Sequence, residues 1–208
     1  MADQGAKIAH NPGSNLRLGS GIAPAEAMRV RGVTLGIGTD GSQCSDNQNM
    51  FEAMRLASFV SRVEKPDPAN WLATEQVLHM ATAGSAEALG MGDMIGRIEP
   101  GFRADIVMLD LGSIGFIPFH DPVNQIVHAE DSTGVAEVMV DGELVVKDRK
   151  LVNIDEAKLR RDVEAAVDRL RGANEEARAF AALLEPVVGR FCVGLANEPY
   201  HIHRHVAG

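Results

Sequence analysis

The strongest constraint on the fold is a pair of short apolar runs that a single helical pattern separates. The first run is AKIA at residues 6–9, and the second is VTLGIG at residues 33–38. Between them, Pro24 suits the start of a helix and Gly32 suits its end. Runs this apolar are typical of parallel strands that are buried on both faces. The sequence therefore predicts a β/α unit with two parallel strands.

One carboxylate comes directly after the second run. Asp40 stands between Thr39 and Gly41, past the glycine-rich end of the predicted strand. The carboxyl ends of parallel strands carry the chemistry of α/β sheets, and neighbouring glycines let a metal ion or substrate approach the backbone. Asp-Gly is also an ordinary turn pair. On spacing alone both interpretations stay open, with the turn favoured over a metal-ligating or proton-accepting carboxylate.

Two predicted helices follow, and the sequence then changes from a helical to a strand-like pattern. Apolar spacing predicts helices over about residues 49–63 and 74–89, with Thr74 as the N-cap of the second and Gly90 just past its end. A strand over about residues 104–111 then begins a β-rich segment.

The β-rich segment and the C-terminal part complete the organisation. Asp141-Gly142 joins two β-rich runs, which predicts a hairpin within a small antiparallel unit. An amphipathic helix is expected over residues 155–170, ended by Gly172, and another over about residues 175–184, before an irregular tail. The chain thus divides into predicted domains at residues 1–95, 96–152 and 153–208.

Composition narrows the class of protein. The net charge is −9, with 29 acidic residues against 20 Lys and Arg, and no basic stripe is present, which argues against nucleic acid as a partner. No apolar run reaches membrane-spanning length, and the first residues lack the basic lead and apolar core of a signal peptide. Cys44 and Cys192 match no metal or redox spacing. Reduced thiols and a cytoplasmic location are expected, with no membrane partner.

The histidines are not equally good candidates for a binding or metal site. His10 follows the first run at a strand end, so it is a candidate pocket residue. HIHRH in the tail places His201, His203 and His205 on one side of an extended segment, a pattern compatible with zinc. No acid follows to orient the rings, so a solvated or interface tail is favoured. Isolated histidines are expected in packing roles: His79, His120 and His128.

Two other chemistries find no support in the sequence. GIGTDG lacks the Lys-Ser/Thr of a phosphate-binding loop, and its acid would repel phosphate. GSGIA does not match the G-x-S-x-G of a nucleophile elbow, so serine catalysis is not expected.

Five stretches, taken in order, resemble the metal-dependent amidohydrolase superfamily. The resemblance is to its aminohydrolase branch, which includes methylthioadenosine/adenosylhomocysteine deaminases, guanine deaminases and triazine hydrolases. Together they cover most of residues 5–150. The matching stretches are GAKIAHNPGSNLRLGSGIAP, GVTLGIGTDGS, NMFEAMRLAS, MATAGSAEALGMGDMIGRIEPGFRADIVMLDL and VMVDGELVVKD.

The resemblance implies an α/β fold and a set of site residues. The fold is the C-terminal part of a (β/α)8 TIM barrel, with part of a small β-sandwich and C-terminal helices. Asp40 is the implied metal ligand, and it takes a proton from the attacking water. His10, Ser14 and Asn15 lie beside the implied substrate pocket, with loop bracing favoured for the last two. Asn11 replaces a cysteine that many members carry, and SQCSDNQN departs from the usual run after the aspartate.

The same resemblance implies that most of the metal site is absent from this chain. The family's other ligands, for zinc or iron with zinc favoured, precede the first strand found here, and a single carboxylate cannot hold a catalytic zinc. We therefore expect a C-terminal segment of a hydrolase that removes an amino group from a heteroaromatic small molecule such as a purine, pterin or triazine. The segment is expected to be inactive alone. The alternative is a noncatalytic interaction or scaffold fragment of the same fold.

Unpaired parallel strands also predict association. Open edges and apolar faces favour pairing with the missing N-terminal barrel portion, homo-oligomerisation or aggregation. Analytical ultracentrifugation that finds a compact, cooperatively melting monomer would count against this expectation.

Overall fold

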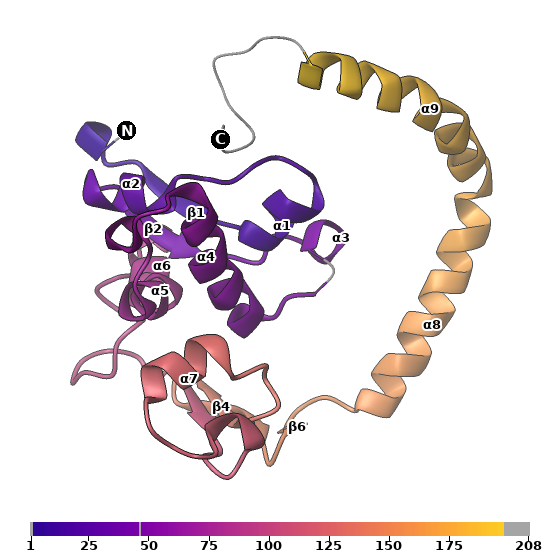
Figure 1. The fold of residues 1–208 in the computed structure, drawn as a ribbon. Helices are drawn as coiled ribbons and strands as arrows, with labels where there is room; N and C mark the ends of the chain where they lie inside the picture. The colour runs from indigo at the N-terminus through magenta and orange to yellow at the C-terminus, as the bar shows by residue number, and fades with distance from the viewer. Residues whose placement is uncertain (1, 46, 198–208) are drawn as a thin grey trace. The chain divides into compact units, whose positions relative to one another are not determined.

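Parallel strands and short helices make up the first part of the chain, and long helices make up the last. The computed structural model describes residues 2–45 and 47–197 (Figure 1). The chain divides into two units, the first ending at Lys150 and the second beginning at Leu151. The predicted mixture of helices and strands is confirmed.

The two predicted parallel strands are present. A 3-10 turn, η1 (Ala2–Gln4), leads into β1 (Lys7–His10), which pairs in parallel with β2 (Thr34–Ile37). The register sets His10 opposite Ile37, so both strands end at the same edge of the sheet. β2 is the more buried strand, as its continuous apolar sequence predicts.

Two short helices lie in segments for which the sequence predicts no helix. The stretch HNPGSN forms most of α1 (Pro12–Arg17), because Pro12 takes the first helical position that proline favours. The predicted helix after Pro24 is α2 (Ala25–Val30), and Gly32 follows it with a φ of 78°, as its role as a helix stop requires. The polar loop after Asp40 contains α3 (Ser42–Ser45).

The next helix agrees with its prediction, whereas the following one is split. α4 (Met50–Glu64) begins at Asn49, whose side-chain oxygen accepts hydrogen bonds from the N–H groups of Phe51 and Glu52. The 3-10 turn η2 (Pro68–Asn70) separates it from α5 (Thr74–Ala81).

The expected single helix over residues 74–89 is two helices. α6 (Ala83–Leu89) follows α5 after a break at Thr82, whose hydroxyl donates to the carbonyl of Leu78 and competes with the helical backbone. Thr74 is not the N-cap, because the cap is Ala73, whose N–H donates to the Gln76 side chain. Gly90 ends α6 in the left-handed conformation, as predicted.

A close approach between α6 and β2 depends on glycine. A Cβ atom built on Gly84 would lie 2.5 Å from the backbone oxygen of Leu35. We expect Gly84→Ala to lower the free energy of unfolding by about 2 kcal/mol, because backbone on both sides must shift. Urea unfolding followed by the fluorescence of Trp71, the single tryptophan, measures this change. The matched Gly172→Ala change, where a Cβ meets nothing within 4 Å, should leave that transition unchanged.

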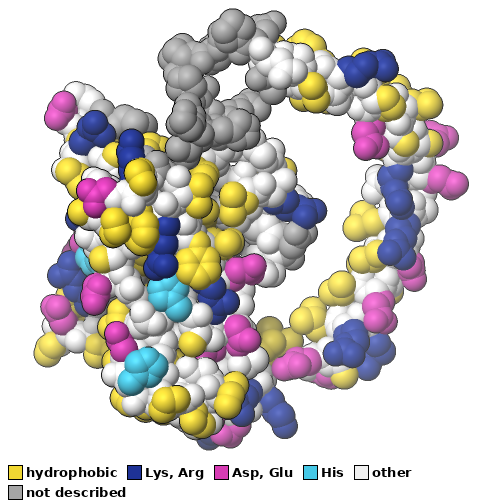
Figure 2. Space-filling model, in the orientation of Figure 1, with side chains coloured by type: hydrophobic (Ala, Val, Ile, Leu, Met, Phe, Trp, Pro, Cys, Tyr) yellow, Lys and Arg dark blue, Asp and Glu magenta, His cyan; other side chains and the backbone are white. Residues whose placement is uncertain are grey.

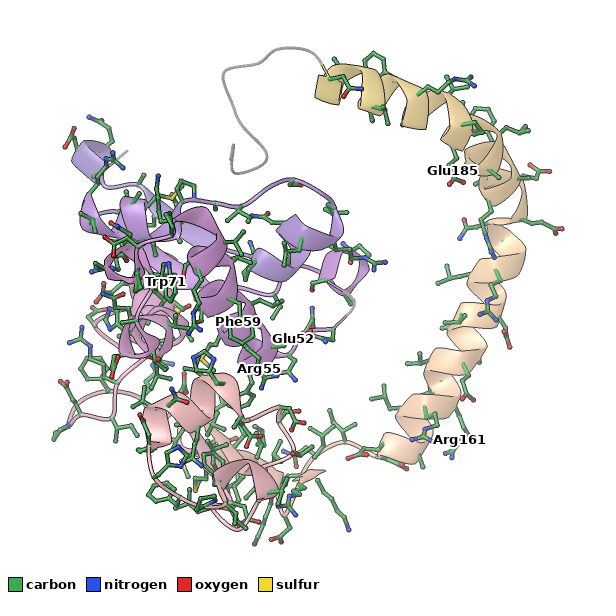
Figure 3. All side chains as sticks on the ribbon, viewed as in Figure 1. Glu52, Arg55, Phe59, Trp71, Arg161 and Glu185 are labelled. Atoms are coloured by element: carbon green, nitrogen blue, oxygen red, sulfur yellow. The ribbon has the colours of Figure 1, made fainter. Side chains whose placement is uncertain are left out.

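The core of the first unit lies between β2 and the helices around it. Leu35 and Ile37 of β2 pack with buried side chains of α4, α5 and α7 (Pro122–His128). Figure 3 shows Arg55 and Phe59 on α4, and the Phe59 ring stacks on His128 of α7 at 5.5 Å. Arg62 lies over both Phe59 and Trp71, at 5.4 and 5.6 Å from the ring centres.

An antiparallel sheet forms the rest of the first unit. It has the order β3 (Ile106–Leu109), β4 (Val135–Val140), β5 (Glu143–Lys147) and β6 (Lys150–Leu151). The predicted hairpin at Asp141-Gly142 joins β4 to β5, with positive φ at both residues. The connection between β3 and β4 carries η3 (Ile114–Phe116) and α7, neither of which was predicted.

Two helices make up the second unit, and both run further than predicted. α8 (Glu156–Ala173) begins at Asp155, which accepts from the N–H of Lys158, and it continues through Gly172. α9 (Glu175–Asn197) includes Pro186, so the expected end at residue 184 is wrong. None of the described helices has the length and apolarity to span a membrane.

Candidate active site

The predicted site residues gather at the carboxyl end of the parallel pair. His10 is the last residue of β1, and its carbonyl accepts from the N–H of Gly38 at 2.9 Å. Asp40 lies three residues beyond the end of β2. α1 begins at Pro12, directly after β1, and carries Ser14 towards the loop that follows β2. The two strand ends therefore bring residues that are far apart in sequence to one edge.

Asp40 has an exposed carboxylate with defined partners. The buried hydroxyl of Ser14 donates to Oδ2 at 2.7 Å, and the N–H of Gly41 donates to Oδ1 at 2.7 Å. The hydrogen bond from Ser14, followed by the one from Gly41, holds the pKa of the carboxyl below its usual value. Asp40 adopts a φ of 60°, which is uncommon for a residue other than glycine. The carboxylate is thus ionised at neutral pH and oriented.

Cys44 is a site residue that the sequence interpretation missed. Its thiol, on α3, faces the Asp40 carboxylate and is a further, smaller cause of the lowered pKa of that group. The sequence assigned Cys44 only as a reduced thiol, and both described cysteines are free. The sequence could have indicated this role, because Cys44 lies four residues after Asp40. A helical turn that begins at Ser42 brings Cys44 back towards the carboxylate.

The hydrogen bond from Ser14 gives a direct prediction. We expect Ser14→Ala to raise the pKa of Asp40 towards its ordinary value, because the first cause of the depression is removed. Carbon-13 NMR titration of the Asp40 carboxyl measures the pKa in each variant. Ser14→Thr, which keeps a hydroxyl, should retain the low pKa. An unchanged pKa in Ser14→Ala would contradict the assignment.

His10 is enclosed at the end of β1. Its side chain is 3% exposed, and neither ring nitrogen has a hydrogen-bond partner among the described atoms. Burial lowers its pKa from 6.5 to about 4, so the imidazole is neutral at pH 7. A neutral imidazole with two unpaired nitrogens is able to donate to one group and accept from another.

Asn15 and a small hollow complete this edge. Asn15 is half-buried on α1, and its carbonyl accepts from the N–H of Ser20 at 2.9 Å, which braces the loop through the backbone. A hollow of about 150 Å³ lies beside the Asp40 loop. Its lining includes Gly13, Leu16, Thr39, Asn49 and Leu56.

The donors present do not fit a catalytic zinc ion by themselves. Over residues 2–45 and 47–197, no cluster of three or more His, Cys, Asp or Glu side chains is placed to hold a metal. A catalytic zinc takes three protein ligands and one open position. Asp40 therefore supplies at most part of a ligand set.

The remaining histidines lie away from this edge or outside the described residues. His79 is exposed, and the exposed His120 has Nδ1 at 2.8 Å from the carbonyl of Pro118. His128 stacks on Phe59, in agreement with its expected packing role. The HIHRH tail lies outside the described residues.

Comparison with known proteins identifies the family. The model of the amidohydrolase family matches residues 1–145. The chain belongs to the amidohydrolase family. The family predicted from the sequence is thus confirmed.

Amidohydrolase relatives of this chain include named deaminases. A 5-methylthioadenosine/S-adenosylhomocysteine deaminase from Acetivibrio thermocellus is 39% identical over 170 residues, which is 82% of this chain and 39% of that protein. The chain therefore spans about two fifths of the length of this curated relative.

Solved amidohydrolase structures resemble the chain in three dimensions. An adenosine deaminase from Xanthomonas campestris with bound zinc has a TM-score of 0.79 and 36% identity over 82% of this chain and 39% of its own. An atrazine chlorohydrolase from Arthrobacter aurescens complexed with zinc has a TM-score of 0.74 and 35% identity over 79% of this chain and 36% of its own.

Proposed function

We propose that this chain forms the C-terminal part of a metal-dependent amidohydrolase that removes an amino group from a heteroaromatic ring. β1 and β2 are the last two strands of its (β/α)8 barrel, and the β3–β6 sheet belongs to its small β-sandwich. The observation that carries the proposal is Asp40 at the carboxyl end of the parallel pair, held by Ser14 of α1, the helix that follows the neighbouring strand. This is the edge at which barrel enzymes place their chemistry.

Asp40 is proposed as the group that takes a proton from the attacking water. An ionised, exposed carboxylate fits this role, and the hydrogen bonds from Ser14 and Gly41 leave the carboxylate oxygens with further lone pairs. Asp40 would also be one ligand of a divalent metal, with zinc favoured because two structural relatives hold it. Zinc, when bound, lowers the pKa of water.

His10, Ser14 and Asn15 are proposed to shape the substrate side of this edge. Ser14 donates a hydrogen bond to Asp40, and the backbone carbonyl of Asn15 braces the loop by accepting from Ser20. Both contacts agree with the bracing role favoured for these two residues. His10 keeps two ring nitrogens without partners, which suits hydrogen bonding to a ring substrate in the whole enzyme. The names of the relatives favour an adenosine-type substrate.

A hybrid enzyme tests this function. In the hybrid, this chain replaces the matching part of the Acetivibrio thermocellus relative, and ring deamination of methylthioadenosine is followed by ultraviolet absorbance. We expect turnover by the hybrid and none by the chain alone, since the chain lacks a full ligand set. A folded hybrid with no turnover and no bound metal would instead favour the noncatalytic alternative.

A further inference from the structure

α8 carries an apolar stripe whose larger side chains stay about half exposed among the described residues of its unit. Leu159, Val163, Ala166 and Leu170 recur at alternating steps of four and three residues, so they follow one face of the helix. Leu159, Val163 and Leu170 are 47%, 51% and 59% exposed. Figure 2 shows hydrophobic side chains along this helix. A face of this kind is stable when another element packs against it.

Charged residues beside the apolar stripe indicate which element packs against it. Asp162 and Arg169 lie seven residues apart, so they follow the same edge of the stripe. When two copies of one helix pack antiparallel, this edge of one copy meets the same edge of the other. Asp162 of each copy then faces Arg169 of the other. The edge is therefore complementary to itself under a two-fold axis, as a homodimer interface requires.

We propose that α8 is a homodimer interface, in which two copies of the chain pack this helix antiparallel. In this register Leu159 lies opposite Leu170 of the second copy, and Val163 lies opposite Ala166 of the second copy. Two kinds of apolar layer and one kind of ion pair then form, and the two-fold axis repeats each of them, so the interface holds four layers and two ion pairs. The antiparallel arrangement also sets the N-terminal end of each helix beside the C-terminal end of the other, which opposes their dipoles favourably.

A parallel pair of the same helices is disfavoured by its own side chains. Glu156 lies seven residues before Val163, in line with the stripe, so a parallel pair would set the two Glu156 carboxylates against each other. Asp162 would face Val167 in such a pair and gain no ion pair. The antiparallel register separates the two Glu156 carboxylates and pairs Asp162 with Arg169.

The size of α8 sets the expected strength. Its 18 residues span about 27 Å, so the pair lies towards the small end of specific interfaces. Association with a Kd of about 10 µM is expected for an interface of this class.

Charge reversal on the full chain tests the proposal. Sedimentation equilibrium gives the dimer Kd of each variant, and circular dichroism checks that helix content is kept. Asp162→Arg creates two Arg–Arg contacts across the interface, so we expect a Kd raised about tenfold. The double variant D162R/R169D exchanges the two charges and should restore the dimer.

Asp168→Arg is the matched control. Asp168 lies on the face opposite the stripe and contacts Arg171 within the helix, as Asp162 contacts Lys158. The two single variants therefore lose similar intrahelical contacts, and D168R should leave the Kd unchanged. A monomeric chain at 100 µM, an unchanged Kd in D162R, or a double variant as weak as D162R would each overturn the proposal. Association through open strand edges of the first unit would appear as self-association that D162R does not alter.

Discussion

We expect Asp40→Asn to lower the kcat of the hybrid enzyme about 1,000-fold while the fold is kept. Asparagine tolerates the left-handed backbone found here, at a φ of 60°, and its amide oxygen still accepts from Ser14 or Gly41. The amide cannot take a proton from water at neutral pH, and it replaces a carboxylate metal ligand, so the lost turnover reflects both changes. Steady-state kinetics give the change in kcat, and circular dichroism confirms the fold.

Asp141→Asn is the matched control for this prediction. Asp141 also precedes a glycine and has a φ of 50°, but it lies in the hairpin between β4 and β5. It contacts Arg103 at 3.3 Å and is remote in sequence from the parallel strands. D141N should keep full turnover. Equal rates for D40N and the unmodified hybrid would mean that Asp40 is only a turn residue.

Acid should destabilise the first unit through His10. The pKa of His10 is about 4 in the folded chain against 6.5 for an ordinary histidine, because burial disfavours the charged ring. Above pH 6.5 both states are neutral, and this group contributes no pH dependence. Between pH 6.5 and 4 only the unfolded chain binds the proton, so stability falls by about 1.4 kcal/mol per pH unit, or about 3 kcal/mol in total.

His10→Leu should remove this loss. Leucine is similar in size and does not titrate, and no hydrogen bond is given up because both ring nitrogens lack partners among the described atoms. Urea unfolding at a series of pH values, followed by Trp71 fluorescence, gives the free energy at each pH. His79→Leu, which removes an exposed histidine, should keep the acid dependence of the unmodified chain. The same dependence in H10L would show that another group causes it.

Elements with strong local signals were predictable from the sequence. Continuous apolar runs gave β1 and β2, and the position of Asp40 followed from the rule that parallel strands end at one edge. The hairpin at Asp141-Gly142 was predictable because the turn requires positive φ, which these residues tolerate. The start of α4 near Asn49 follows from side-chain capping, which is also local.

Features that depend on tertiary contacts were not predictable. The break at Thr82 depends on a hydroxyl that competes with the backbone, and it coincides with the close approach of Gly84 to Leu35. The continuation of α9 through Pro186 was not predictable for a local reason, because a proline removes one helical hydrogen bond and usually marks a helix end. The enclosure of His10 arises only when the two strand ends meet, whereas the position of Cys44 near Asp40 is local and depends on α3, which was not predicted.

The content of bound metal in the hybrid enzyme tests the central claim most directly. Inductively coupled plasma mass spectrometry on the dialysed protein measures metal per chain and compares the unmodified hybrid with D40N and D141N. The account predicts about one metal ion per chain in the unmodified hybrid and in D141N, since a catalytic site holds one ion on three protein donors. D40N should lose most of its metal on dialysis. Full metal retention and full turnover in D40N would contradict the placement of Asp40 at a metal-dependent active site.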